Sequence, residues 1–217
     1  MKHVLISVFV AGSLLAHARA SQPESGQTKV GGPSITMCIL IDNSGSMSDK
    51  RAGVMAASLA LVRASHAHDE VGIVDFNDEA LNSLPDGEYF TRDIKEMEEA
   101  LTRIDSRGGS AMRDAVRTSI DQIEKTAHND RKILVLVTDG NDTSSTVAQE
   151  QLLSEVRNSG VRIYSIGLLN EANPGHAAAK IALERLAEAS GGRAYYPKDL
   201  AELGSISQEI ANGVRKQ

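Results

Sequence analysis

The feature that most constrains the fold is a regular alternation of short apolar runs, rich in β-branched residues, with longer segments of helical period. The predicted strands are Ile35–Ile41, Glu70–Phe76, Lys132–Thr138, Val161–Gly167 and a shorter Arg193–Tyr196. Two of these runs are almost continuously apolar, which is typical of strands covered on both faces. The alternation therefore predicts an α/β domain: a doubly wound, mostly parallel sheet flanked by helices on both faces.

The segments between the strands repeat apolar residues at helical spacing. The clearest stripes are Ile94, Met97, Leu101 and Ile104, then Met112, Val116, Ile120 and Ile123, and last Leu200, Leu203, Ile206 and Ile210. Further helices are expected over 49–65, 147–158 and 176–190, and the last stripe places a helix over 199–212. The segment Leu81–Tyr89 contains a Pro-Asp-Gly turn and predicts an edge strand or hairpin.

The N-terminus has the pattern of an export signal. Lys2 and His3 precede an apolar stretch over 4–16, and Ala18-Arg19-Ala20 supplies small residues for cleavage. The stretch is shorter than the roughly 20 residues that cross a bilayer. We therefore expect a signal peptide over 1–20, with an uncleaved anchor as the alternative, and after cleavage no stable membrane insertion. Residues 21–34 read as a flexible tether, and 35–217 as one folded domain in a periplasmic or secreted protein.

Composition argues against several classes of partner. The chain has 29 acidic and 23 basic residues, and the first twenty contain two bases and no acid, so their removal changes the formal charge from −6 to −8. Nucleic acid is a disfavoured partner, because phosphate contacts would oppose this charge. Aromatic residues make up only 3% of the chain and Trp is absent, so a surface on which sugars or single-stranded nucleic acid could stack is not expected. The single Cys38 excludes an internal disulfide and is expected to be a buried strand thiol.

Polar residues gather at the predicted carboxyl ends of the strands, where open α/β sheets bind ligands. Asp42, Ser44 and Ser46 follow the first strand at alternate positions. Asp139 follows the third long strand, and Ser110 lies in a Gly-Gly-Ser loop ahead of the helix over 111–125. Because alternate residues of an extended loop point the same way, the first three side chains can face one point.

The five residues offer only oxygen ligands, two carboxylates and three hydroxyls. Such ligands suit a hard divalent cation with octahedral geometry near 2.1 Å, so Mg²⁺ is the predicted ion and Mn²⁺ a substitute. Asp139 would hold a coordinated water. The Asp42-x-Ser44-x-Ser46 motif alone also fits turn and helix-cap chemistry, because Asp, Asn, Ser and Gly are common turn formers.

Neighbouring polar residues leave alternatives open. Asp114 either supports the Ser110 loop or is a first-turn acid that interacts favourably with the helix dipole. The run 142–144 is either a second cation site or, as we prefer, a solvated loop capping the helix over 147–158. The acids of the run 75–78 are assigned to turn chemistry.

Three motifs together resemble a known site. They are Ile41-Asp42-Asn43-Ser44-Gly45-Ser46-Met47, Arg107-Gly108-Gly109-Ser110-Ala111-Met112-Arg113-Asp114-Ala115 and Thr138-Asp139-Gly140-Asn141-Asp142. In this order they resemble the metal-ion-dependent adhesion site of von Willebrand factor type A (VWA) domains, and in particular an exported bacterial branch. The resemblance runs from Ile35 to the end of the chain.

The resemblance implies a Rossmann-like VWA fold, Mg²⁺ at the five residues, and a partner protein whose Glu or Asp side chain completes the coordination. The chain departs from the family pattern at Ser110, where Thr is commoner; the hydroxyl is retained. Relatives in this branch also commonly continue past the last helix into further strand sequence, whereas this sequence stops at Gln217.

Enzymatic function is not expected. A Gly-x-Ser-x-Gly elbow around Ser44, a P-loop and a dinucleotide-binding glycine pattern are all missing from the sequence. A phosphatase with Asp42 as nucleophile would want a second aspartate at position 44. The sequence therefore predicts a non-catalytic binding module. The alternatives are a structural assembly component whose ion only braces the loops, and a metal-dependent hydrolase on the same sheet.

Overall fold

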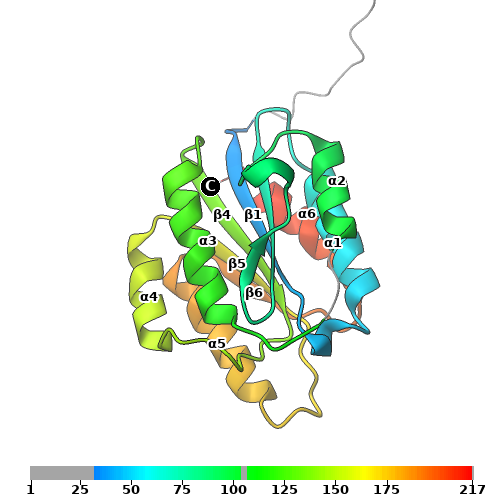
Figure 1. The fold of residues 1–217 in the computed structure, drawn as a ribbon, viewed down its shortest axis with the longest axis vertical. Coiled ribbons are helices and arrows are strands. Elements are labelled where there is room, and N and C mark those ends of the chain that lie inside the picture. The colour runs from blue at the N-terminus through cyan, green and yellow to red at the C-terminus, as the bar shows by residue number, and fades with distance from the viewer. Residues whose placement is uncertain (1–31, 104–106, 217) are drawn as a thin grey trace, which may run out of the picture. The chain divides into compact units, whose positions relative to one another are not determined.

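The computed structural model describes residues 32–103 and 107–216. The predicted signal peptide and the tether as far as residue 31 lie outside the described residues. Within the described part, six strands form one sheet in the order β3-β2-β1-β4-β5-β6 (Figure 1). The strands are β1 (Ile35–Asp42), β2 (Glu70–Phe76), β3 (Ala80–Asn82), β4 (Arg131–Thr138), β5 (Arg162–Gly167) and β6 (Arg193–Tyr195).

The sheet has the predicted, mostly parallel organisation. Every neighbouring pair is parallel except β2 and β3, which pair antiparallel. The five predicted strands are confirmed with ends that differ by at most one residue. The edge strand predicted in the segment 81–89 is confirmed as β3, and a short 3₁₀ turn over Pro85–Gly87 follows it.

Helices cover both faces of the sheet (Figure 1). One face packs against α1 (Arg51–Arg63), α2 (Ile94–Thr102) and α6 (Glu202–Gly213). The other packs against α3 (Met112–Thr126), α4 (Gln149–Asn158) and α5 (His176–Ala189). Strand β1 supplies side chains to both cores in alternation and is buried along its whole length, as its continuous apolar run predicted.

In two of the predicted apolar stripes, the first residue is exposed and not buried. Ile94 is 43% exposed, because it begins α2 directly after the N-cap Asp93 and extends beyond the core. Leu200 is 39% exposed and precedes α6, where it lies over Gly53 of α1. Ile104 lies outside the described residues.

Cys38 is fully buried in β1, as predicted for a strand thiol, and burial raises the pKa of the thiol to about 12. The thiol is therefore protonated and shielded from reagents at neutral pH. Among the described residues we find no helix with the length and apolar character needed to cross a membrane.

A buried ion pair lies near the amino end of β1. The Asp69 carboxylate accepts hydrogen bonds from the backbone N–H of Ile35 at 3.0 Å and of His66 at 2.6 Å. It also accepts one from Arg215 Nη2 at 2.5 Å. The pair thus ties the segment after α6 to the start of β1.

Candidate metal centre at the carboxyl edge of the sheet

Asp42 lies at the end of β1, beside the end of β4. The parallel register that pairs Ile41 with Val137 brings Thr138 next to Asp42. Thr138 Oγ1 donates a 2.6 Å hydrogen bond to Asp42 Oδ2, and the Ser44 N–H donates to Asp42 Oδ1 at 3.0 Å. Both carboxylate oxygens are therefore oriented by the protein, and each keeps acceptor capacity for another ligand.

The two serines of the first motif come together as their alternate spacing predicted. After Asp42 the chain enters a 3₁₀ turn over Gly45–Met47, and Ser44 Oγ lies 3.1 Å from Ser46 Oγ. Ser44 is buried, whereas Ser46 is exposed. The hydroxyl pair therefore reaches from the buried end of β1 to the protein surface.

The glycine-rich loop lies directly against this turn. The Gly45 N–H donates to the Gly108 carbonyl at 3.2 Å, and the Arg107 N–H donates to the Asn43 carbonyl at 2.8 Å. These bonds bring Ser110 from a distant part of the chain to the same edge. Its Oγ is buried and has no hydrogen-bond partner among the described residues. An unpaired buried hydroxyl costs free energy, so a cation at this edge would satisfy an atom that the protein leaves unpaired.

Asp139 follows β4 and is 7% exposed. Its Oδ1 accepts from the Asn141 N–H at 3.1 Å. Burial raises the pKa of Asp42, and the negative charge of Asp139 acts in the same direction, although hydrogen bonds from Ser44 and Thr138 oppose it. The two carboxylates thus repel each other, and a bound cation would relieve that repulsion.

The donors present fit a hard cation. Within the described ranges, no group of three or more His, Cys, Asp or Glu side chains could hold a metal ion. The candidate set contains only two such side chains, Asp42 and Asp139, and its other three ligands are serine hydroxyls. A soft metal that prefers thiolate or imidazole finds no suitable ligands in this set, whereas Mg²⁺ and Mn²⁺ do.

The residues after β4 hold the Ser110 loop. The Thr143 and Ser144 N–H groups donate to the Ser110 carbonyl at 2.8 and 3.0 Å, and the Ser110 N–H donates to Thr143 Oγ1 at 3.0 Å. The predicted capping role of 142–144 is wrong: α4 begins after Ala148, and no side chain caps it. The hydroxyls point instead to the neighbouring loop, a contact that depends on tertiary structure.

The two acids near the end of β2, Asp75 within the strand and Asp78 after it, are more than turn formers. Asp78 Oδ2 accepts from the Gly109 N–H at 3.2 Å, and Asp78 Oδ1 accepts from Ser144 Oγ at 2.9 Å. Asp75 accepts from Asn43 Nδ2 at 2.9 Å. Sequence reasoning missed these positions, and the available signal was that β2 ends at the same sheet edge as β1 and β4.

Asp114 combines the two roles considered for it. It lies in the first turn of α3, and its carboxylate accepts from the Thr146 N–H, Thr146 Oγ1 and the Val147 N–H at 2.9 to 3.0 Å. Burial alone would raise its pKa, but these hydrogen bonds outweigh it and hold the pKa below its ordinary value. Asp114 therefore fixes the loop that in turn holds Ser110.

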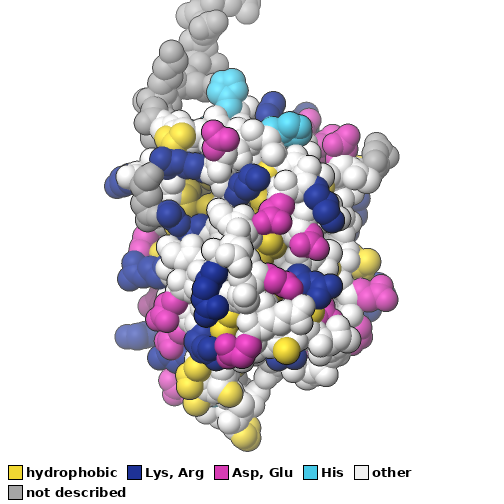
Figure 2. All heavy atoms as spheres, turned by 90° about the vertical axis from the view of Figure 1, so that its left-hand side faces the viewer, with side chains coloured by type: hydrophobic (Ala, Val, Ile, Leu, Met, Phe, Trp, Pro, Cys, Tyr) yellow, Lys and Arg dark blue, Asp and Glu magenta, His cyan; other side chains and the backbone are white. Residues whose placement is uncertain are grey.

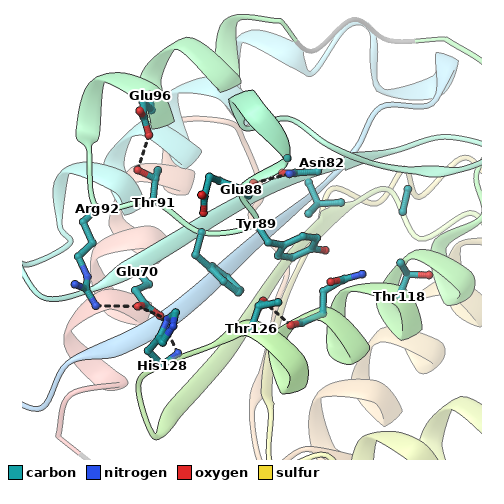
Figure 3. A pocket seen from close by; sticks show the side chains of 15 residues that line it. Glu70, Asn82, Glu88, Tyr89, Thr91, Arg92, Glu96, Thr118, Thr126 and His128 are labelled. Atoms are coloured by element: carbon teal, nitrogen blue, oxygen red, sulfur yellow. Dashed lines mark hydrogen bonds and ion pairs between the residues drawn. The ribbon is translucent and has the colours of Figure 1, made fainter.

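A separate groove lies between the segment after β3 and helix α3. It has a volume of 1160 Å³, and none of the five predicted ligands lines it. Figure 3 shows Glu70 in this groove, between Arg92 and His128; Arg92 Nη2 donates to Glu70 Oε1 at 2.8 Å. The buried carboxylate is thus matched by partners of the protein itself, and the groove is distinct from the candidate metal centre.

Comparison with known proteins places the fold and the sequence in one family. Residues 37–209 match the family model of the von Willebrand factor type A domain. The curated protein calcium-activated chloride channel regulator 1 of Mus musculus is 29% identical over 186 residues, which cover 81% of this chain and 18% of that protein. The chain therefore spans about a fifth of the length of this relative.

Solved structures share the fold at low sequence identity. A von Willebrand factor type A protein from Catenulispora acidiphila has a TM-score of 0.70 and 23% identity, over 84% of this chain and 43% of that one. The von Willebrand factor domain of a type V pilus tip protein from Porphyromonas gingivalis has a TM-score of 0.67 and 12% identity, over 85% and 96%. Because the family model covers residues 37–209, which is most of the chain, the chain belongs to the von Willebrand factor type A domain family, and the solved structures share its fold.

Proposed function

We propose that this domain is an exported, non-catalytic protein-binding module that captures a partner carboxylate through Mg²⁺ at the carboxyl edge of its sheet. The observation that carries the proposal is the buried, unpaired Ser110 hydroxyl in a loop hydrogen-bonded to the turn that presents Ser44 and Ser46. Export is proposed from the N-terminal signal pattern. The pilus tip protein among the structural neighbours supports a role in adhesion.

The proposed ligand set explains why the ion would seek a partner. Ser44, Ser46 and Ser110 would bind it directly as neutral ligands, while Asp42 and Asp139 would act through coordinated water. Mg²⁺ so held keeps most of its positive charge and favours one more anionic ligand. A Glu or Asp side chain of a partner protein can displace a water and supply that charge.

The electrostatics favour a short-range contact. The chain carries a net charge of −6, which repels an acidic partner at a distance. At the exposed edge the divalent ion dominates the local potential, so a single carboxylate can bind it. One exposed ion contact provides too little free energy for specific binding, and the loops around the ion must therefore contribute further contacts.

Metal binding can be tested with matched serine variants. Isothermal titration with MgCl₂ should show saturable binding to the wild type and markedly weaker binding to the Ser44→Ala/Ser46→Ala double variant. Ser205→Ala, an exposed serine of α6, serves as the control. Equal affinity in the double variant and the control would remove the two hydroxyls from the site.

The partner chemistry needs a separate experiment. Proteins captured from the envelope fraction in Mg²⁺ should be released by EDTA, and replacing the partner's contacting Glu by Gln should abolish capture. Capture that survives both EDTA and Asp42→Ala would favour the alternative in which the ion only braces the loops. Mg²⁺-dependent turnover of phosphoesters or peptides would favour the hydrolase.

A further inference from the structure

We infer that the domain has a second binding site, for a phosphate-type oxyanion, in a basic cleft at the amino ends of β4 and β5. The cleft has a volume of 350 Å³. Its charged lining consists of four bases and one acid, namely Arg131, Lys132, Arg157, Arg162 and Asp130. In a chain with a formal charge of −6, this local excess of positive charge requires an explanation.

The fold brings these side chains together from three segments. Arg131 and Lys132 begin β4, Arg162 begins the adjacent parallel strand β5, and Arg157 lies in the last turn of α4. Gly160 has a φ of +66° and turns the chain from α4 into β5, which returns Arg157 to the start of the strand. The cluster therefore depends on tertiary structure, and a run of charges in the sequence does not reveal it.

Internal ion pairs account for similar side chains elsewhere. Arg63 pairs with Glu98 at 2.9 Å, and Arg193 pairs with Glu209 at 2.8 Å. In the part of the chain that the structure describes, neither Lys132 nor Arg157 forms an ion pair. The dipole of α4 favours a base at its last turn, which accounts in part for Arg157, and Arg131 Nη1 donates to the Val214 carbonyl at 2.9 Å. Neither interaction neutralises a positive charge, and neither explains Lys132.

The chemistry of the lining favours a phosphate group. Guanidinium groups donate paired N–H bonds that match two oxygens of one phosphate, and a lysine adds a compact charge. A group with several charged oxygens can engage bases on opposite walls of the cleft, which a single carboxylate does less well. Figure 2 shows Lys and Arg side chains gathered in the upper left part of the face that it presents.

The cleft and the candidate metal centre lie at opposite ends of β4. This strand runs for eight residues from Arg131 to Thr138, which separates its ends by about 23 Å. A phosphate at the cleft therefore leaves the carboxyl edge free for a protein partner. The phosphate could belong to a lipid headgroup or be a small free anion, and the experiment distinguishes these sources.

The test compares two variants with equal loss of charge. Lys132→Gln/Arg157→Gln removes two bases from the cleft, and Lys125→Gln/Arg117→Gln removes two exposed bases from α3. The probes are inorganic phosphate, followed by calorimetry, and vesicles of phosphatidylglycerol with phosphatidylcholine, followed by co-sedimentation. We expect the cleft variant to bind about tenfold more weakly or worse, and the α3 variant to change less than about twofold. Thermal unfolding of both variants checks that they are folded.

Each outcome has a defined meaning. Loss of phosphate binding in the cleft variant alone supports a small-anion site, and loss of vesicle binding alone supports a lipid-headgroup site. Binding of phosphate or of vesicles to the wild type should weaken in monovalent salt and persist in EDTA, which distinguishes this site from the metal centre. Absence of saturable wild-type binding to either probe, or equal binding of the two variants, would overturn the inference.

Discussion

The Thr138 hydroxyl lies 2.6 Å from the Asp42 carboxylate and links the carboxyl ends of two neighbouring strands. The same Oγ1 accepts a hydrogen bond from the Gly140 N–H at 2.9 Å. One threonine therefore orients Asp42 and shapes the loop that presents Asp139. Groups that orient metal ligands in this way contribute strongly to metal affinity.

Thr138→Val should weaken Mg²⁺ binding about ten- to a hundredfold, because it removes the hydroxyl that orients Asp42 and preserves side-chain volume. Isothermal titration measures the change. Thr126→Val is the control, because that hydroxyl donates to the Gln122 carbonyl on the exposed side of α3. Similar Mg²⁺ affinities for the two variants would contradict the orienting role.

Comparison of Ser110→Ala with Ser119→Ala should distinguish the proposed role of the Ser110 hydroxyl as a metal ligand from a role in packing. Both serines are buried, and both hydroxyls lack a hydrogen-bond partner among the described residues. Either substitution should therefore change the free energy of unfolding by less than about 1 kcal/mol without metal. Only Ser110→Ala should weaken Mg²⁺ binding, since Ser119 lies in the middle of α3. Equal affinities in the two variants would exclude Ser110 as a ligand.

The glycine before Ser110 is closely surrounded. A Cβ at Gly109 would lie 2.5 Å from Asp78 Oδ1 and 2.8 Å from Ser144 Oγ. Gly109→Ala should therefore displace the loop, lower the free energy of unfolding by roughly 1–3 kcal/mol and weaken Mg²⁺ binding. Denaturant unfolding and calorimetry measure the two effects.

Gly204→Ala provides a control of opposite sign. Gly204 lies inside α6 and nothing approaches its missing Cβ within 4 Å. Alanine there should stabilise the protein by up to about 1 kcal/mol and leave Mg²⁺ binding unchanged. A Gly109→Ala variant that behaved like Gly204→Ala would show that the Ser110 loop tolerates displacement.

The sheet could be predicted from sequence because its signal is local and redundant. Each buried strand is an apolar run, and the order of strands and helices restricts the topology to few choices. The extent of each helix's buried face was harder to predict, as Ile94 and Leu200 show: an apolar residue at the end of a stripe fits the period and is still exposed. Periodicity identifies a face of a helix, whereas neighbouring elements decide where that face ends.

The candidate site was predictable only as far as its motifs are local. Ser44 and Ser46 converge because they lie two positions apart in one turn, with only Gly45 between them. The contacts of Asp78 and Thr143 with the Ser110 loop join segments from different strands, and their residue types are those of ordinary turns. Sequence could place these residues at one sheet edge, and only the fold shows which of them hydrogen-bond.

Acid should destabilise the domain in part through Asp69. Burial alone would raise the pKa of Asp69, but hydrogen bonds from Arg215, His66 and Ile35 outweigh it and hold the pKa below the ordinary value. In the unfolded chain the pKa is about 3.9. The stabilisation by ionised Asp69 is therefore fully present above that pH and is lost as pH falls through the lower folded value.

Asp69→Asn should lower the free energy of unfolding by about 3 kcal/mol at pH 7, because it leaves the buried Arg215 without its anionic partner. The difference between wild type and variant should shrink as the pH falls from 5 to 3 and below. Glu70 also has a lowered pKa, so only this difference isolates Asp69. Denaturant unfolding across this range, with exposed Asp121→Asn as control, measures it. A difference that stayed constant with pH would show that hydrogen bonding, and not the charge of Asp69, stabilises this end of the sheet.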